Sequence, residues 1–264
     1  MAITSLIQER PSPKMDVIFD ALIQGWPGAK RNVKPRDMVI LWGLIGDNQR
    51  ILLSEKSIFV DMPYFHRWLP GQDLEKSNWR FIAGGVHNGD KLNVTIDRFE
   101  SFNIKVKPWQ MNGEHILVCP SSNSMTLHLH GMTAQDWVDI IVKRLKEQTN
   151  RPIRVRHKPR KNGTSGPSVA DTPIEKDLEG CYALVTSGSL TAVDALINGV
   201  PVFSSSPNFC PAAWCTNLSD IENIKYFDRE SLFANLAWKQ FSIDEMKNGF
   251  CHEHFTRFYN NQSS

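Results

Sequence analysis

The 264-residue sequence predicts an α/β protein built from two halves, and three features point to that class. Short apolar runs that favour strands alternate with amphipathic stretches at helical spacing. No segment recurs at a fixed period, which argues against a solenoid or a propeller. Apolar residues make up 41% of the chain and charged residues 22%, a globular balance that excludes a disordered tail.

The first half is expected to contain one β-α-β unit. Residues 38–42 (MVILW) are apolar and favour a strand, and a glycine ends the run. Residues 48–56 are expected to form a short helix, and residues 57–61 (SIFVD) a second strand that a Met-Pro pair ends. Residues 70–114 hold several Gly and Pro turns and are expected to be irregular, with short strands or helices.

The second half is expected to begin with a strand at residues 115–119 (HILVC). A long helix should follow, because Thr133 is a good N-cap, Asp136 stands three residues later, and apolar residues recur at helical spacing as far as Leu145. Residues 153–156 then favour another strand.

A loop rich in Gly, Ser, Thr and Pro is expected at residues 163–173. Residues 181–185 (CYALV) predict a strand, which a Ser-Gly-Ser turn joins to a helix at 190–197. An Asn-Gly pair should cap that helix before a strand at 200–203. Helices are also expected at 229–238 and 243–258.

The boundary between the halves falls near residues 110–118. The residues after about 229 could belong to either half. We therefore divide the chain into residues 1–114, 115–228 and 229–264.

The composition predicts a cytoplasmic protein without a membrane segment. No stretch approaches the ~20 apolar residues of a membrane helix, and the first residues lack the apolar core of a secretory signal. The five cysteines are odd in number and scattered, so a disulfide framework is not expected. The net charge of +2 is too small by itself to indicate a nucleic-acid binder.

The strongest candidate site is the turn Ser187-Gly188-Ser189 between a strand and a helix. Free N–H groups and the positive end of a helix dipole favour a phosphate there, the hydroxyls add donors, and the glycine allows a close approach. Asp194, in the helix, could accept hydrogen bonds from sugar hydroxyls. In the alternative interpretation, the two serines only cap the helix and Asp194 is solvated.

A basic segment at residues 151–161 (RPIRVRHKPRK) forms the second candidate, with six Lys or Arg and no acid. Strand alternation places Arg154, Arg156 and Lys158 on one face near a carboxyl strand end, which is where open α/β sheets bind ligands. Three cations there suit a diphosphate. The alternative is a solvated basic surface.

A third candidate lies at the end of the strand at 57–61. Asp61 or His66 could act as a general base. The alternative is a turn-forming aspartate and a surface histidine.

A metal site is not expected in the sequence. The cysteines and histidines toward the C-terminus lack a paired C-x-x-C spacing; they are Cys210, Cys215, Cys251, His252 and His254. The pair His128-x-His130 would share one face of a strand and is interpreted as a polar surface pair. P-loop, nucleophile-elbow and zinc-protease motifs do not occur in the sequence.

The second half resembles a known family. A strand ending in R-x-[HK]-P, then strand, Ser-Gly-Ser, helix and [DE]-A-L-x-x-G-[VI]-P-V, resembles the C-terminal half of GT-B glycosyltransferases, closest to the capsule-polysaccharide and sialyltransferase-like branches. The strings VILWGL and VDMPYF in the first half, and LAWKQFSIDEMKNG near the end, are similar to glycosyltransferase-like proteins of tailed bacteriophages.

The resemblance implies two Rossmann-like domains facing across a cleft, with the C-terminal helix crossing back to the first domain. The second half would bind a nucleotide sugar such as a UDP-sugar, and helix dipoles and cations would neutralise the leaving phosphate without a metal. The implied phosphate contacts are Ser187, Gly188, Ser189, Arg156 and Lys158, the last where relatives often carry His. Asp194 stands where relatives often carry Glu and would bind ribose, and Ser121 and Ser122 would line the same pocket.

The implied reaction is sugar transfer to a hydroxyl, with Asp61 as the base and His66 as the second choice. The phage likeness and the basic segment favour DNA with a hydroxylated pyrimidine, such as a hydroxymethyl base, in the host cytoplasm. Such a base would be flipped out and could stack on aromatic side chains, for which the candidates are Tyr64, Phe65, Trp68 and Trp79. Their alternative is ordinary core. A polysaccharide acceptor and a catalytically silent nucleotide-binding module also stay open.

Overall fold

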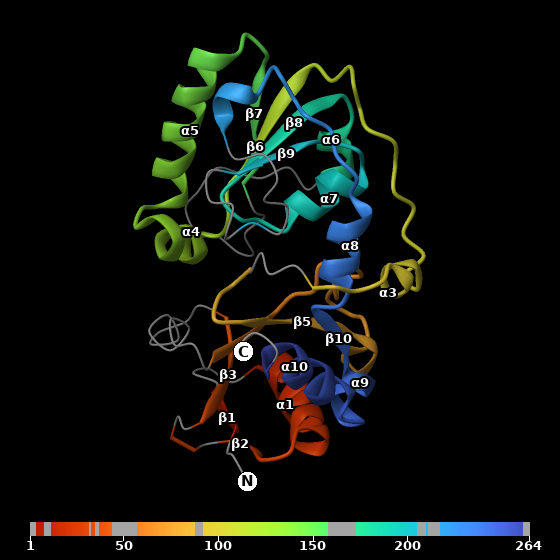
Figure 1. Cartoon of the computed structure of the whole chain (residues 1–264). Helices are drawn as coiled ribbons and strands as arrows, with labels where there is room; N and C mark the ends of the chain where they lie inside the picture. Colours follow the sequence, from red (N-terminus) through yellow and green to blue (C-terminus); the bar gives the residue numbers. More distant parts are fainter. Residues whose placement is uncertain are drawn as a thin grey trace. The chain divides into compact units, whose positions relative to one another are not determined.

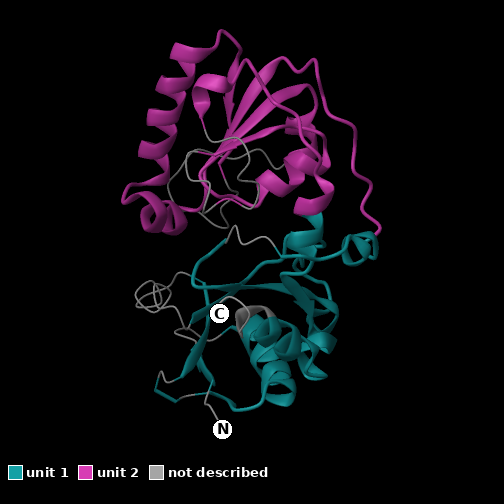
Figure 2. Cartoon of the chain, viewed as in Figure 1, with its two compact units in different colours: residues 1–102, 233–264 teal, residues 103–232 magenta. Residues whose placement is uncertain are grey.

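The computed structural model describes residues 4–7, 12–31, 33–34, 37–43, 57–87, 92–157, 173–204, 210 and 217–260. The chain forms two compact units, residues 1–102 with 233–264 and residues 103–232 (Figure 2). The C-terminal segment therefore folds with the first unit. The helix expected at 48–56 and nearly all of the loop expected at 163–173 lie outside the described residues.

The first unit contains a six-stranded sheet in the order β10-β5-β4-β3-β1-β2 (Figure 1). The strands are β1 (Thr4–Ile7), β2 (Ala29–Arg31), β3 (Met38–Trp42), β4 (Ser57–Asp61), β5 (Asn78–Ala83) and β10 (Gln240–Ser242). The pairings among β1, β2, β3 and β4 are parallel, whereas β5 is antiparallel to both β4 and β10. The two strands expected from apolar runs are confirmed as β3 and β4.

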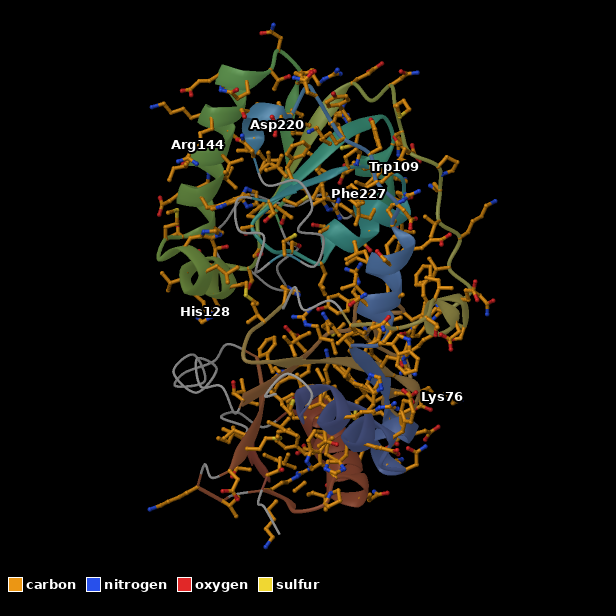
Figure 3. All side chains as sticks on the ribbon, in the orientation of Figure 1. Lys76, Trp109, His128, Arg144, Asp220 and Phe227 are labelled. Carbon is orange, nitrogen blue, oxygen red and sulfur yellow. The ribbon has the colours of Figure 1, made fainter. Side chains whose placement is uncertain are left out.

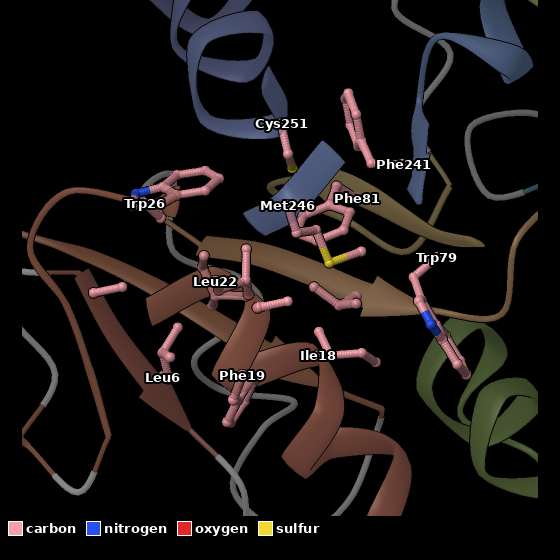
Figure 4. Close-up of a cluster of buried hydrophobic side chains, with 14 of the residues drawn as sticks. Leu6, Ile18, Phe19, Leu22, Trp26, Trp79, Phe81, Phe241, Met246 and Cys251 are labelled. Atoms are coloured by element: carbon pink, nitrogen blue, oxygen red, sulfur yellow. The ribbon is translucent and has the colours of Figure 1, made fainter. Parts of the chain in front are cut away.

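The first unit also contains helices, some of which pack on its sheet. They are α1 (Pro13–Gly25), η1 (Leu74–Lys76), α3 (Asp97–Glu100), α9 (Ile243–Lys247) and α10 (Phe250–Asn260). Of these, α1, α9 and α10 pack on the sheet. Ile18 and Leu22 of α1 pack with Trp79 of β5 and Met246 of α9 in a buried cluster (Figure 4). The single helix expected at 243–258 is wrong: Gly249, with φ 89°, separates α9 from α10.

The second unit contains a sheet in the order β7-β6-β8-β9 whose described pairings are all parallel. Its strands are β6 (His115–Cys119), β7 (Ile153–Val155), β8 (Cys181–Thr186) and β9 (Val202–Ser204). The strands expected in this half are confirmed within one or two residues. Because the strands are parallel, their carboxyl ends lie at one edge of the sheet.

The helices of the second unit are α4 (Asn123–His130), α5 (Ala134–Gln148), α6 (Ile174–Leu178), α7 (Thr191–Ile197) and η3 (Leu218–Asp220). The helix α8 (Glu230–Ala237) spans the boundary between the units. Thr133 and Asp136 form the capping box predicted for α5.

His128 and His130 lie on α4, so their placement on a strand was wrong: Ser122 caps a helix there. None of the described helices has the length and apolar character needed to cross a bilayer.

Residues 103–114 fold with the second unit, although the sequence predicts a boundary at 114/115. Lys107 N–H donates to Ile197 O at 2.8 Å, and Gln110 N–H donates to Gly199 O at 2.7 Å. The Arg229 guanidinium lies 4.0 Å from the centre of the Trp109 ring. The Trp109 ring also packs near Phe227 (Figure 3). The two hydrogen bonds attach the segment to the end of α7 and to the turn that follows it.

Candidate functional site

The carboxyl edge of the second unit brings two of the predicted loops together. Ser121 follows β6 and Ser187 follows β8, and these strands are neighbours in the sheet. The Ser121 N–H donates to Ser187 Oγ at 3.1 Å, and both residues are buried. Ser187 therefore ties the two loops together, which is a different use of its hydroxyl from the predicted phosphate contact.

The turn after β8 is held by a residue that the sequence did not single out. Thr186 Oγ1 accepts hydrogen bonds from the N–H groups of Gly188 at 3.4 Å and Ser189 at 3.1 Å. Ser189 Oγ accepts from Thr191 N–H at 3.3 Å, which is the capping role of the alternative interpretation. Gly188 has φ 135°, a conformation that favours glycine. The bond from Gly188 is longer than an ordinary N–H···O bond, whereas the bond from Ser189 has an ordinary length.

The loop after β6 presents a second set of polar groups at the same edge. Ser122 caps α4 by accepting from Met125 N–H at 3.3 Å, and its residue surface is exposed. The Ser121 hydroxyl oxygen is buried and has no hydrogen-bond partner among the residues described. A buried hydroxyl without a protein partner is uncommon, which makes Ser121 Oγ a candidate donor to a ligand.

His130 lies beside this edge, a position that the sequence did not predict. Burial lowers the pKa of His130, while a contact with the Ser187 backbone acts in the opposite direction. Its ring packs near Trp137, with centroids 6.2 Å apart. A neutral imidazole is therefore expected next to the Ser187 turn at pH 7. The helix α4, and not a strand, brings it there.

Arg156 lies close to this edge, but its charge is engaged. Its N–H donates to Val118 O at 2.9 Å, and its guanidinium forms an ion pair with Asp177 of α6. The cation thus has an acid partner that the sequence did not reveal, because Asp177 lies 21 positions away and on another element. Lys158 lies outside the described residues, so the predicted trio of cations stays a prediction.

Asp194 lies within α7 and is partly buried. One of its carboxylate oxygens, Oδ2, is shielded from solvent. Its backbone oxygen accepts from the Asn198 backbone and side-chain nitrogens at 3.0 and 2.9 Å. The side chain is thus turned partly inward, and the solvated alternative does not describe it fully.

Asp61 lies at the carboxyl end of β4 in the first unit. Its Oδ2 accepts from Arg80 Nη2 at 3.1 Å, and its Oδ1 accepts from Met62 N–H at 2.7 Å. The Asp61 side chain retains 27% of its exposure, whereas that of Arg80 retains 2%. Arg80 and the Met62 N–H therefore fix the orientation of the carboxylate, which solvent can still reach.

His66 follows in the loop after β4, with φ 49° and an exposed surface. Its ring lies edge-on to Phe102, with centroids 5.5 Å apart. It lines an open hollow of about 540 Å³ together with Arg67, Trp68 and Lys76. The surface-histidine alternative thus describes the exposure of His66.

Most of the aromatic side chains proposed to stack on a base are core residues. Tyr64, Phe65 and Trp79 are at most 2% exposed. Trp68 is partly exposed and donates its indole N–H to Gln72 O at 2.9 Å. The core alternative is therefore correct for three of the four aromatics.

The described cysteines and histidines form neither a metal-binding group nor, at Cys119 and Cys181, a reactive thiolate. No group of three or more His, Cys, Asp or Glu there could hold a metal ion, and Cys215 lies outside it. Burial raises the pKa of the Cys119 and Cys181 thiols to about 12, so neither is a reactive thiolate at neutral pH.

No protein-family model matches the sequence. No curated protein matches it either. Among solved structures the chain is similar to KpsC of Thermosulfurimonas dismutans, a beta Kdo 2,7 transferase, with a TM-score of 0.55 and 12% identity over 96% of this chain and 99% of that one. The chain has a GT-B-like α/β fold. At this identity the likeness establishes the fold, and chemistry must be argued from the residues.

Proposed function

We propose that the chain is a glycosyltransferase that moves a sugar from a nucleotide sugar to an acceptor hydroxyl. The observation that carries the proposal is the contact between Ser121 and Ser187, which joins the ends of β6 and β8 in one polar edge. The GT-B-like fold supports it, because a glycosyltransferase shares that fold. Ligands of open parallel sheets bind at the carboxyl ends of the strands.

The donor phosphates are assigned to this edge of the second unit. The amides of Gly188 and Ser189 would exchange Thr186 Oγ1 for phosphate oxygens, and the Ser121 and Ser122 hydroxyls would donate to them. Ser187 would hold the two loops in register.

The remaining predicted contacts stay part of the proposal. The Arg156 guanidinium would bind the diphosphate, either while it keeps its ion pair with Asp177 or after that pair breaks. Lys158 would add a second cation. Asp194 would accept from the ribose hydroxyls. In this scheme a UDP-sugar is the donor, and amides and cations neutralise the leaving group without a metal.

The reaction would transfer one proton and one glycosyl group. The acceptor oxygen forms a bond to the anomeric carbon, while the bond from that carbon to the phosphate oxygen breaks. The acceptor proton passes to the Asp61 carboxylate, with His66 as the second candidate base, and the nucleotide leaves with the electron pair.

A saccharide hydroxyl is the acceptor that we favour. The similar solved structure is that of a Kdo transferase, and three of the four aromatics offered for base stacking are buried. DNA carrying a hydroxylated pyrimidine is the second candidate, because the segment 151–161 carries six Lys or Arg. Mass spectrometry of a glycan mixture and of hydroxymethylated DNA after incubation with donors separates the two.

Ser121→Ala gives the sharpest test of the donor site. Removing a buried hydroxyl that has no partner among the described residues should leave the melting temperature unchanged or higher. Calorimetric titration with UDP-, CMP- and other nucleotide sugars should nevertheless show ~10-fold weaker binding, about the loss of one hydrogen bond to a charged group.

Ser219→Ala is the matched control, because Ser219 is an exposed serine of the same unit on η3. A wild-type chain that binds none of the nucleotides would contradict the proposal. Binding without release of nucleotide to any acceptor would identify a silent module instead.

A further inference from the structure

Three polar residues form a row across the sheet of the first unit. Asp61 of β4 stands opposite Arg80 of β5, and Arg80 stands opposite Gln240 of β10. In a sheet, residues that face each other in this way share one face. The row therefore links the end of β4 to a strand supplied by the C-terminal segment.

Arg80 occupies the middle of the row and is almost fully buried. The residue is 1% exposed, and its guanidinium carbon lies 5.6 Å from the ring centres of Phe59 and Tyr64. Its Nε and Nη1 atoms have no hydrogen-bond partner among the residues described. A buried guanidinium with two unused donors is costly in free energy, so a purely structural purpose would be better met by an apolar residue.

Among the residues described, the ionic partner of Arg80 is Asp61. Arg80 Nη2 and the Met62 N–H each hold one oxygen of the carboxylate, at 3.1 and 2.7 Å. Each carboxylate oxygen keeps a further lone pair. The 27% exposure of the Asp61 side chain leaves that capacity open to a proton donor.

Gln240 holds the loop that follows Asp61. Its Oε1 accepts from the N–H groups of Tyr64 at 2.9 Å and Phe65 at 3.0 Å, and its Nε2 donates to Phe65 O at 3.3 Å. Gln240 is fully buried. The position of the loop on which His66 stands is thus set by the C-terminal strand.

We propose that Arg80 is a positioning residue that acts on sugar transfer through Asp61, with Gln240 holding the adjoining loop. The inference rests on the proposed function, because Asp61 is assigned there as the proton acceptor. Arg80 fixes the carboxylate in one orientation, so that its open lone pairs meet the acceptor hydroxyl. Such pre-orientation lowers the barrier of proton transfer without a contact between Arg80 and the substrate.

A double-mutant cycle tests the coupling between the two residues. Nucleotide release from the donor that the titration panel identifies is measured for wild type, Arg80→Met, Asp61→Asn and the double variant. Arg80→Met should lower kcat by ~100-fold with little change in the KM of the donor. In the Asp61→Asn background the same change should have almost no further effect.

Two additional variants complete the experiment, one as a substitute if Arg80→Met does not fold and one as a control. Arg80→Lys keeps the charge and should recover part of kcat, and the cycle is run with it if Arg80→Met does not fold. Arg31→Met is the matched control, because Arg31 pairs with Asp16 and Asp20 over the Phe19 ring of the same unit. It should leave kcat unchanged.

The outcomes separate the two ideas. An active wild type with equal losses from Arg80→Met in both backgrounds, or with no loss in kcat, would overturn the positioning role alone. A wild type that releases nucleotide from no donor removes the proposed function, and the inference with it.

Discussion

Arg98 and Glu245 form a two-pronged ion pair, with Arg98 Nη1 and Nη2 each 2.7 Å from one oxygen of the carboxylate. The same guanidinium donates to the backbone oxygens of Ala237 and Gln240. It therefore joins α3 to three successive parts of the C-terminal segment. This bond and the Gln240 contacts explain why residues 233–264 fold with the first unit.

Arg98→Met should destabilise the first unit by about 3 kcal/mol, because the partly buried Glu245 carboxylate loses its cationic partner and two backbone oxygens lose a donor. The Ser242 N–H would still donate to Glu245 Oε2 at 2.8 Å. Urea unfolding followed by tryptophan fluorescence measures the change. Arg257→Met, at an exposed position on α10, is the control and should change the free energy of unfolding by less than about 0.5 kcal/mol. Equal effects of the two variants would show that the ion pair does not anchor the segment.

Gly199→Ala should be far more destabilising than Gly131→Ala. Both glycines have a left-handed backbone, with φ 77° and 68°. A Cβ atom at Gly199 would lie 1.9 Å from Pro108 O, whereas nothing lies within 4 Å of one at Gly131. We expect a loss of about 1 kcal/mol at Gly131 from the backbone alone, and at least twice that at Gly199. Thermal unfolding compares them, and similar losses would contradict the close approach of residues 103–114 to α7.

Gly188→Ala should weaken nucleotide binding by at least ~10-fold, because a side chain at φ 135° moves the amides that we assign to the phosphates. Calorimetric titration with the best nucleotide of the panel measures this. Gly180→Ala, at φ 64° with open space around it in the same unit, controls for backbone strain away from the edge. Unchanged affinity in Gly188→Ala would remove the turn from the donor site.

His254 should make the first unit less stable in mild acid. Burial lowers the pKa of His254 to about 4, below its ordinary 6.5, and the nearby Arg98 acts in the same direction. The unfolded chain takes up a proton there below pH 6.5 and the folded chain does not, so this stability is present above 6.5 and is lost as pH falls toward 4. The partial exposure of the side chain limits the effect to about 1–2 kcal/mol.

The comparison of wild type with His254→Gln isolates this histidine. Between pH 7 and pH 4.5 the wild type should lose more stability than the variant, as measured by urea unfolding at each pH. The ring of His254 stacks on Trp238 with centroids 4.7 Å apart, so the variant is also expected to be less stable at pH 7. Parallel pH profiles would show that His254 does not carry the difference.

Local patterns of the sequence determined many of the helices and strands. The apolar runs of β3, β4, β6 and β8 are recognisable as strands from residues that are adjacent in the sequence. The cap of α5 was predicted as well, since Thr133 and Asp136 are only three residues apart. The short strands β2 and β10 carry too few residues for such a pattern, and sheet pairing defines them.

The sequence by itself determined the fold class and the polar turn between β8 and α7, because both follow from residues close together in the chain. Tertiary structure alone decided which charges meet. Asp61 with Arg80 and Arg156 with Asp177 are pairs formed by sheet register and helix packing. Residues 19 and 21 positions apart have no local periodicity that could announce their contact, so only the packed sheet could bring these side chains together.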